Sequence, residues 1–174
     1  MRADSAGEAQ GATFVVELPL VRERIEQTDG ERPPRLDADG GAGLGFANLA
    51  GLHILTVDDE PDARELLAAI LQRAGADVAV SASAAEALRL CHLRKADVIV
   101  SDIGMPEEDG YAFIQKVRTL KLQSGVVPAV ALTANARSED RSRALAAGFQ
   151  MHLAKPIDPA EFTKAIAELI AETR

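Results

Sequence analysis

The stretch HILTVDDEPDARELL, at residues 53–67, decides the fold, because an apolar strand pattern passes directly into a helical one. Residues 53–57 form a short apolar run of the kind that makes a buried strand. Pro61 suits the first turn of a helix, and apolar residues recur after it at helical spacing. Asp58 and Asp59 stand at the junction. The stretch therefore predicts a strand, two carboxylates and a helix in direct succession.

The same alternation of strands and helices continues to the end of the chain. Further strands are predicted at residues 77–81, 97–101, 129–132 and 151–154. Helices are predicted at residues 61–74, 111–120, 139–147 and 158–172, and one more is predicted after Ser83, with Glu86 completing a capping box. Strict alternation predicts an α/β fold: a parallel, doubly wound, flavodoxin-like sheet of five strands in the order 2-1-3-4-5, with five helices.

The composition limits what kind of protein this is. Hydrophobic residues make up 47% of the 174 residues and aromatic residues only 3%, so the core is expected to be aliphatic. The net charge of -8 argues against nucleic-acid binding, which needs basic patches. No apolar run approaches the ~20 residues of a membrane span, so no membrane contact is expected. Cys91 is expected to be a small core residue in a reducing, cytoplasmic location.

The region before residue 52 has a different character. GATFVVELPL, at residues 11–20, predicts one short strand that closes at Pro19. Residues 21–51 are first charged and broken by prolines and then rich in Gly and Ala, which is typical of a flexible linker. The expected division is therefore a short N-terminal piece at residues 1–20, a linker at 21–51 and the α/β domain at 52–174.

Polar residues stand at the ends of several predicted strands. Asp102 follows the apolar run that ends at residue 101, Thr133 ends the next run, and Lys155 follows the last strand. The carboxyl ends of parallel strands share one edge of a sheet, and ligands bind there. Three carboxylates, counting the two at residues 58 and 59, should therefore meet a hydroxyl and an ammonium. That combination suits a divalent cation and a phosphoryl group.

Each of these residues also has an ordinary structural explanation. Asp58 and Asp59 could cap the helix that begins at Pro61, Lys155 could be a surface lysine, and Thr133 a plain strand former. However, placing two carboxylates together opposite a third costs free energy without a cation. The set as a whole therefore favours a functional site.

Residues 52–174 strongly resemble the receiver domain of two-component response regulators. The resemblance is carried by Asp58–Asp59, by SDIGMPEEDG at residues 101–110, by Thr133–Ala134 and by Lys155–Pro156. Any one of these motifs alone is weak, but all four stand in order on the expected strand ends. The resemblance implies that Asp102 accepts a phosphoryl group from a phosphohistidine on a histidine kinase or a histidine phosphotransfer protein.

The resemblance also implies a role for the residues around Asp102. It implies that Mg²⁺ is the cofactor, bound by Asp59 and Asp102 directly, by Asp58 mainly through water, and by the carbonyl of Gly104. Lys155 and Thr133 are expected to act with Asp102 in catalysis by binding the phosphoryl oxygens. Ala134, next to Thr133, is small and leaves room for the phosphoryl group.

Two departures from the family pattern concern switching and hydrolysis. His152 stands where the family usually has Tyr or Phe, a side chain that moves inward together with Thr133. It could act in the same way and add pH sensitivity, or it could be an exposed histidine without a switch role. Switching would act on the face formed by residues 139–172, which could also mediate a homodimer. In the family that the chain resembles, the positions held here by Gly104 and Asn135 flank the phosphoryl group and help set the hydrolysis rate.

The N-terminal piece carries a second resemblance. RADSAGEAQGATFVVELPL, at residues 2–20, is similar to the last β-hairpin of histidine-kinase ATP-binding domains. It implies that the chain is the C-terminal receiver of a hybrid sensor histidine kinase, preceded by a remnant of the ATP-binding domain. GAGLGFANL, at residues 41–49, looks like a glycine-rich ATP lid, but it stands after the closing strand and lacks the Asn- and Asp-bearing motifs. No phosphorylation from ATP by this chain alone is expected.

Two functions of different class follow from the sequence. The first is a phosphoacceptor that performs its own phosphotransfer chemistry. The second is a phosphorylation-independent docking module that keeps the fold and uses only the face at residues 139–172. The complete set of three aspartates, Thr133 and Lys155 favours the first, because a degenerate module is expected to have lost at least one of them.

Overall fold

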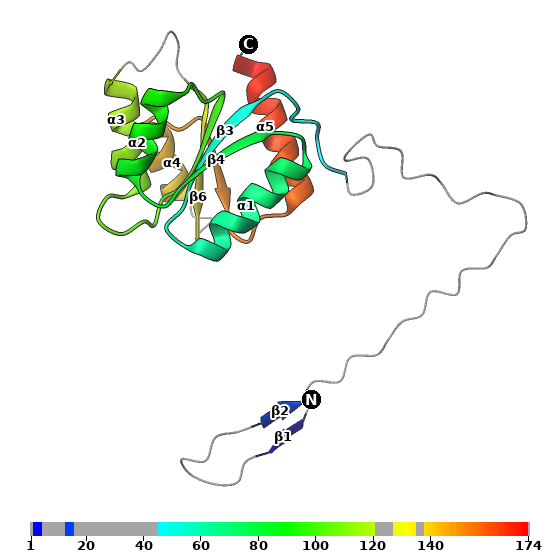
Figure 1. Ribbon diagram of the computed structural model, residues 1–174. Helices are drawn as coiled ribbons and strands as arrows, with labels where there is room; N and C mark the ends of the chain where they lie inside the picture. Colours follow the sequence, from blue (N-terminus) through cyan, green and yellow to red (C-terminus); the bar gives the residue numbers. More distant parts are fainter. Residues whose placement is uncertain (1, 5–12, 16–44, 121–126, 135–137, 174) are drawn as a thin grey trace, which may run out of the picture. The chain divides into compact units, whose positions relative to one another are not determined.

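The structure is a computed structural model that describes residues 2–4, 13–15, 45–120, 127–134 and 138–173 (Figure 1). The chain divides into two units, residues 1–35 and residues 36–174. The second unit contains all of the predicted α/β elements, and it carries the candidate site.

The first unit contains a small antiparallel β-ribbon. Strand β1 (Arg2–Asp4) pairs with strand β2 (Thr13–Val15), with Arg2 opposite Val15 and Asp4 opposite Thr13. β2 lies inside the strand predicted at residues 11–20. The residue pattern did not predict β1, because its three residues show no apolar alternation, although the resemblance of residues 2–20 to a β-hairpin implies a partner strand. Pro19 and residues 21–44 of the predicted linker lie outside the described residues.

The second unit is built on a parallel sheet of five strands within the described residues. The strands are β3 (His53–Val57), β4 (Asp77–Ser81), β5 (Val98–Asp102), β6 (Ala129–Thr133) and β7 (Met151–Ala154). Their order is β4-β3-β5-β6-β7, which confirms the predicted flavodoxin-like order. β5 and β6 each end one residue later than predicted. As a result, Asp102 and Thr133 are the last residues of their strands.

Helices cover both faces of this sheet (Figure 1). They are α1 (Pro61–Arg73), α2 (Ala84–Leu93), α3 (Gly110–Thr119), α4 (Ser138–Ala147) and α5 (Pro159–Thr173). α2 begins directly after Ser83 as predicted, and the other four lie within one residue of their predicted bounds. α1 and α5 lie on one face, and α2, α3 and α4 lie on the other. Within the described ranges, none of the helices combines the length and apolar character that a membrane span requires.

Alternating residues of the central strands supply the two halves of the core. β3, β5 and β6 are buried along their whole length, as expected for strands covered on both faces. The side facing α1 and α5 contains Ile54, Val98, Val100, Val130 and Leu132. The side facing the other three helices contains Leu55, Val57, Ile99, Ala129 and Ala131. The period of two follows from the pleat of the strands.

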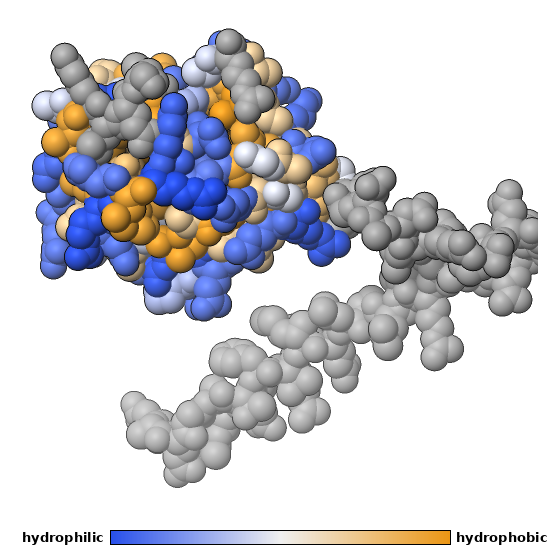
Figure 2. Space-filling model, turned by 45° about the horizontal axis from the view of Figure 1, so that its top comes forward, coloured by the Kyte–Doolittle hydropathy of each residue, from blue (hydrophilic) through white to orange (hydrophobic). Residues whose placement is uncertain are grey.

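Few large apolar side chains reach the surface of this unit. Figure 2 shows a face that is largely hydrophilic, with apolar patches between the polar residues. Cys91 is buried against the core, and burial raises the pKa of its thiol. This environment agrees with the predicted role of Cys91 as a small core residue.

The start of α2 corrects one detail of the sequence prediction. Ser83 Oγ accepts from the Glu86 N–H at 3.3 Å, as predicted for the helix cap. However, Glu86 Oε2 accepts from the N–H of Ala82 at 2.9 Å and from the Ser81 hydroxyl at 3.1 Å. In a capping box it would accept from the Ser83 N–H. The carboxylate therefore ties α2 to the end of β4 rather than to the capping residue.

Residues 46–51, predicted to belong to a flexible linker, pack against helices α1 and α5 of the same unit. Leu49 is 1% exposed and belongs to the apolar cluster under α1 and α5. Its N–H donates to the Ala74 carbonyl at 2.8 Å, and the Ala47 N–H donates to Thr163 Oγ1 at 3.1 Å. The Arg73 guanidinium lies 5.7 Å from the centre of the Phe46 ring. The Gly- and Ala-rich composition concealed two apolar anchors, Phe46 and Leu49.

We therefore expect Leu49→Ala to lower the free energy of unfolding by about 2–4 kcal/mol, because it empties a filled core position. The matched control is Leu93→Ala, since Leu93 is 82% exposed and should change stability by less than about 0.5 kcal/mol. Urea unfolding followed by far-UV circular dichroism measures both. Equal effects of the two substitutions would contradict the packing of residues 46–51.

Candidate functional site

Lys155 joins two of the predicted aspartates at the carboxyl edge of the sheet. Its Nζ lies 2.9 Å from Asp58 Oδ2 and 2.6 Å from Asp102 Oδ1. Asp58 directly follows β3, Asp102 ends the adjacent strand β5, and Lys155 directly follows β7. The parallel topology thus brings Lys155 next to Asp58, which lies 97 positions earlier in the sequence, and next to Asp102, which lies 53 positions earlier.

The two carboxylates are withdrawn from water. The side chain of Asp58 is fully buried, that of Asp102 is 10% exposed and that of Lys155 is 29% exposed. Burial acts to lower the pKa of Lys155, but hydrogen bonds and charge from Asp102 and Asp58 outweigh it, so the pKa lies above its ordinary value. The ammonium is therefore held in its charged form, and it offsets the repulsion between the two carboxylates.

The raised pKa of Lys155 predicts a loss of stability at alkaline pH. Because the folded-state pKa lies above the ordinary value of 10.5, the stability that this ammonium contributes is fully present below pH 10.5. It is lost as the pH rises from there through the folded-state value. Urea unfolding between about pH 9 and pH 11.5 should show a steeper decline for the wild type than for Lys155→Met. Parallel curves for the two proteins would contradict this assignment.

Backbone contacts hold Asp58 in place at the start of α1. Its Oδ1 accepts from the Glu60 N–H at 3.0 Å, and its own N–H donates to the Ser81 carbonyl at 3.1 Å. Glu60 is the capping residue of α1, and its side chain makes no capping hydrogen bond. Asp58 therefore orders the turn before the helix rather than capping the helix itself. Asp59 is exposed.

The loop between β5 and α3 folds tightly around Asp102. The Gly104 N–H donates to Asp102 Oδ2 at 2.6 Å, and a Cβ on Gly104 would lie only 3.3 Å from that oxygen. A Cβ on Gly110 would collide with the Asp102 carbonyl oxygen, so this position requires glycine. Asp109 Oδ1 caps α3 by accepting from the Ala112 N–H at 2.8 Å. The motif at residues 101–110 thus holds Oδ2 of Asp102, while Lys155 holds Oδ1.

Thr133 and His152 lie side by side on β6 and β7. Thr133 Oγ1 is 3.0 Å from His152 Nε2, and Thr133 is only 7% exposed. His152 is half-buried, so the ring is not the freely exposed side chain of the alternative interpretation. Ala134 is exposed, and Asn135 lies outside the described residues. The peptide bond between Lys155 and Pro156 is cis.

The oxygen donors at this edge are of the kind that Mg²⁺ prefers. Carboxylate and carbonyl oxygens suit a hard cation that keeps several of its waters and needs few protein ligands. Among the described residues, however, no group of three or more acidic, His or Cys side chains is arranged as a complete metal cluster. The reason is visible in the geometry, since Lys155 bridges Asp58 and Asp102 while Asp59 is exposed. The oxygen donors at this edge are thus of the type that Mg²⁺ prefers, although Lys155 occupies two of them in this structure.

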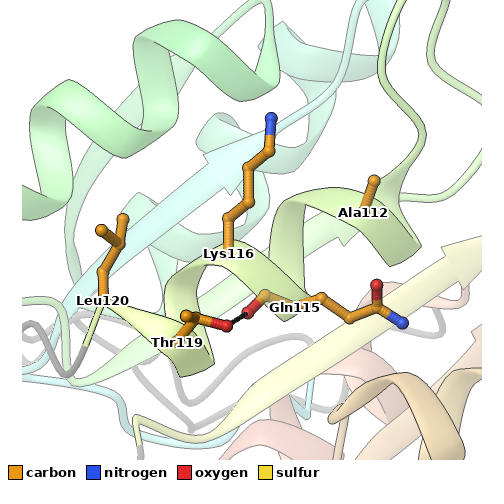
Figure 3. Close-up of a pocket in the computed structure, with 5 residues that line it drawn as sticks. All are labelled: Ala112, Gln115, Lys116, Thr119 and Leu120. Carbon is orange, nitrogen blue, oxygen red and sulfur yellow. Dashed lines mark hydrogen bonds between the residues drawn. The ribbon is translucent and has the colours of Figure 1, made fainter.

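A hollow on the outer face of α3 is separate from this site. Its volume is about 420 Å³, and it is lined by Ala112, Gln115, Lys116 and Thr119 of α3 and by Leu120, which directly follows the helix (Figure 3). Its one charged side chain, Lys116, is already paired with Glu108 at 2.8 Å. None of the residues predicted to take part in chemistry lines this hollow.

One residue that touches the acidic turn was not singled out by the sequence pattern. Arg64 Nη1 donates to the backbone carbonyls of Asp58 and Asp59. The available signal was its position in the first turn of the predicted helix, close to the end of β3. An arginine at that place is otherwise an ordinary solvent-facing helix residue, so its type alone indicates nothing.

The fold and the residues at its sheet edge define an α/β domain of the receiver type. The model of the response regulator receiver domain family matches residues 54–167. The chain belongs to this family.

Similar proteins include short and long chains. An uncharacterized 14.6 kDa protein of Leptolyngbya boryana is 46% identical over 120 residues, which cover 69% of this chain and 91% of that protein. The sensor histidine kinase RcsC of Escherichia coli K12 is 32% identical over 141 residues, which cover 81% of this chain but only 14% of the kinase. The receiver domain of the Pseudomonas aeruginosa sensor histidine kinase PA1611 is 35% identical, with a TM-score of 0.63, and covers 70% of this chain and 99% of that domain. That structure is described with a magnesium ion coordinated in its active-site cleft.

Proposed function

We propose that this chain is a phosphoacceptor in a two-component phosphorelay and that Asp102 receives the phosphoryl group. The observation that carries the proposal is the lysine bridge between Asp58 and Asp102, with Nζ 2.9 Å and 2.6 Å from the two carboxylates. A lysine that only stabilised the fold would not need two carboxylates at the ligand-binding edge of a parallel sheet.

The proposed reaction is an in-line transfer from a phosphohistidine. A carboxylate oxygen of Asp102 forms a bond to phosphorus as the phosphorus–nitrogen bond breaks, and the imidazole leaves with the bonding electron pair. The Gly104 N–H holds Oδ2 of the nucleophile during this step. Lys155 then pairs with the phosphoryl oxygens, and the Thr133 hydroxyl donates to one of them. The exposed Ala134 leaves the approach open.

The proposed cofactor is Mg²⁺, held by Asp58, Asp59, Asp102 and the carbonyl of Gly104. When bound, the ion would neutralise charge that otherwise repels the anionic phosphoryl group from a carboxylate nucleophile. The chain contributes the oxygen donors, and Lys155 supplies the positive charge that is present without the ion.

Thr133 and His152 are the proposed switch. Binding of a phosphoryl group draws the Thr133 hydroxyl away from its present contact, 3.0 Å from His152 Nε2, and the ring is free to take a second position. This difference in contacts shifts the balance between two conformations of the surface formed by α4, β7 and α5. The same surface is the proposed contact for a homodimer.

The proposed context is the C-terminal end of a hybrid sensor histidine kinase. Residues 1–20 would be the remnant of an ATP-binding domain, followed by a linker at 21–51 whose last residues pack on the receiver domain at 52–174. The β1–β2 ribbon and the similarity to two sensor histidine kinases support this arrangement. The phosphoryl donor would then be a histidine kinase or a histidine phosphotransfer protein.

Intact-protein mass after incubation with acetyl phosphate tests the proposed function. We expect a gain of one phosphoryl group in the presence of Mg²⁺ and none after chelation of the ion. If acetyl phosphate and phosphohistidine donors both fail on folded protein, the chain is instead a docking module that uses only the α4–β7–α5 surface.

A further inference from the structure

Arg64 ties together the backbone of both aspartates at the end of β3. Its Nη1 lies 2.7 Å from the Asp58 carbonyl oxygen and 3.2 Å from the Asp59 carbonyl oxygen. Arg64 belongs to the first turn of α1, and its own N–H donates to the Glu60 carbonyl at 3.0 Å. One side chain thus spans the turn from strand to helix.

The turn before α1 lacks an ordinary side-chain helix cap. The capping residue Glu60 makes no side-chain hydrogen bond to α1, and Pro61 has no N–H to offer. Many helices fix their entry turn through a capping Ser, Thr, Asp or Asn. Here the guanidinium of Arg64 holds the turn through the carbonyls on its other side. The path of the acidic turn therefore depends on Arg64.

The two aspartates depend on Arg64 to different degrees. Asp58 is also fixed by its contacts with Glu60 and Ser81, and its side chain is buried. Asp59 is exposed and none of the described contacts holds its carboxylate, so the region that the carboxylate can reach is set mainly by the position of its backbone. The Arg64 contact to the Asp59 carbonyl is the one that would keep this carboxylate at the sheet edge.

We propose that Arg64 is a positioning residue that orients the Asp58–Asp59 pair toward the divalent cation. This inference rests on the proposed function, because it assigns a role to Arg64 in the same metal site. Arg64 acts through the backbone of the acidic pair and does not itself contact the ion.

A purely electrostatic role of Arg64 makes the opposite prediction. A positive charge beside an acidic site disfavours cation binding, so removing the charge alone would tighten Mg²⁺ binding. Removing a residue that orients ligands loosens binding, and outer-shell partners of metal ligands typically contribute about 10-fold to 100-fold in affinity. The sign of the change in affinity therefore separates the two roles.

Arg89 offers a matched control. The pKa of Glu86 is lowered mainly by hydrogen bonds from Ala82 and Ser81, and the charges of both Arg89 and Arg64 add to this effect. Arg89 is thus a second arginine near the same carboxylate, and it is exposed whereas Arg64 is half-buried. None of the hydrogen bonds found in the described residues joins it to Asp58 or Asp59.

The first experiment measures, without metal, how strongly the turn between β3 and α1 is protected from hydrogen exchange. Amide hydrogen exchange of Glu60, whose N–H donates to Asp58 Oδ1, should become about tenfold faster in Arg64→Gln and stay unchanged in Arg89→Gln. Arg64→Lys, which keeps the charge but loses the planar guanidinium, should fall between the wild type and Arg64→Gln. Unchanged exchange in Arg64→Gln would overturn the proposed positioning.

The second experiment titrates Mg²⁺ while following the amide resonance of Gly104, whose N–H donates to Asp102. We expect the dissociation constant to rise about tenfold in Arg64→Gln and less than about twofold in Arg89→Gln. An equal or lower dissociation constant in Arg64→Gln would overturn the inference. A wild-type protein that does not respond to Mg²⁺ would overturn the proposed metal site, while the exchange experiment would still decide whether Arg64 holds the turn.

Discussion

Asp102→Asn should reduce phosphoryl transfer to this chain by more than about a thousandfold, because asparagine lacks the nucleophilic carboxylate. The substitution keeps the size of the side chain, and its amide oxygen can still accept from the Gly104 N–H. Loss of transfer would therefore report lost chemistry rather than a lost fold. Transfer from a labelled phosphohistidine protein measures the rate.

Asp77→Asn is the control for this experiment, because it removes an exposed carboxylate at the amino end of β4, at the edge of the sheet opposite the site. It should accept phosphoryl groups as the wild type does. Rapid transfer to Asp102→Asn at the wild-type rate would show that another residue is the acceptor. Such a result would remove the central role of Asp102.

Lys155→Met should destabilise the protein strongly when no Mg²⁺ is present. The substitution leaves Asp58, which is fully buried, and Asp102 facing each other without a cation. Breaking a buried ion pair costs about 3–5 kcal/mol, and the 29% exposure of Lys155 reduces the expected loss to about 2–4 kcal/mol. Mg²⁺ should restore part of this stability, because a ligand that binds only the folded state stabilises it. Urea unfolding with and without the ion measures both effects.

Lys164→Met is the matched control for this second prediction. Lys164 is 72% exposed and lies 3.7 Å from Glu168 on the surface of α5, where an ion pair contributes less than about 1 kcal/mol. Its substitution should change stability little and should not respond to Mg²⁺. A Lys155→Met protein that behaves like Lys164→Met would mean that the lysine bridge does not exist in solution.

The sequence predicted the fold best where the spacing of apolar residues and the topology of a parallel sheet both constrain the structure. Apolar runs followed by helical spacing located every strand and helix of the second unit, since a parallel sheet with helices on both faces buries its strands completely. The convergence of Asp58, Asp102 and Lys155 followed from the same topology, because the carboxyl ends of parallel strands meet at one edge. The contact between Thr133 and His152 is a diagonal one between β6 and β7, because His152 pairs with Ala131, two residues before Thr133.

Features that depend on single contacts could not be predicted from the sequence. Leu49 lies in a Gly- and Ala-rich stretch, so composition indicated a linker where two apolar side chains anchor the chain. Glu86 bonds one residue earlier than a capping box requires, which is a matter of local geometry. Arg64 reaches backbone carbonyls, and backbone atoms carry no sequence signal.

The identity of the phosphorylated residue tests the central claim most directly. Wild-type protein would be phosphorylated in the presence of Mg²⁺, the acyl phosphate trapped by borohydride reduction, and the modified peptide sequenced by mass spectrometry. We predict a single modified position, Asp102, which lies between the Gly104 amide and the Lys155 ammonium. Modification at Asp58 or Asp59, or the absence of any modification with acetyl phosphate and phosphohistidine donors alike, would contradict it.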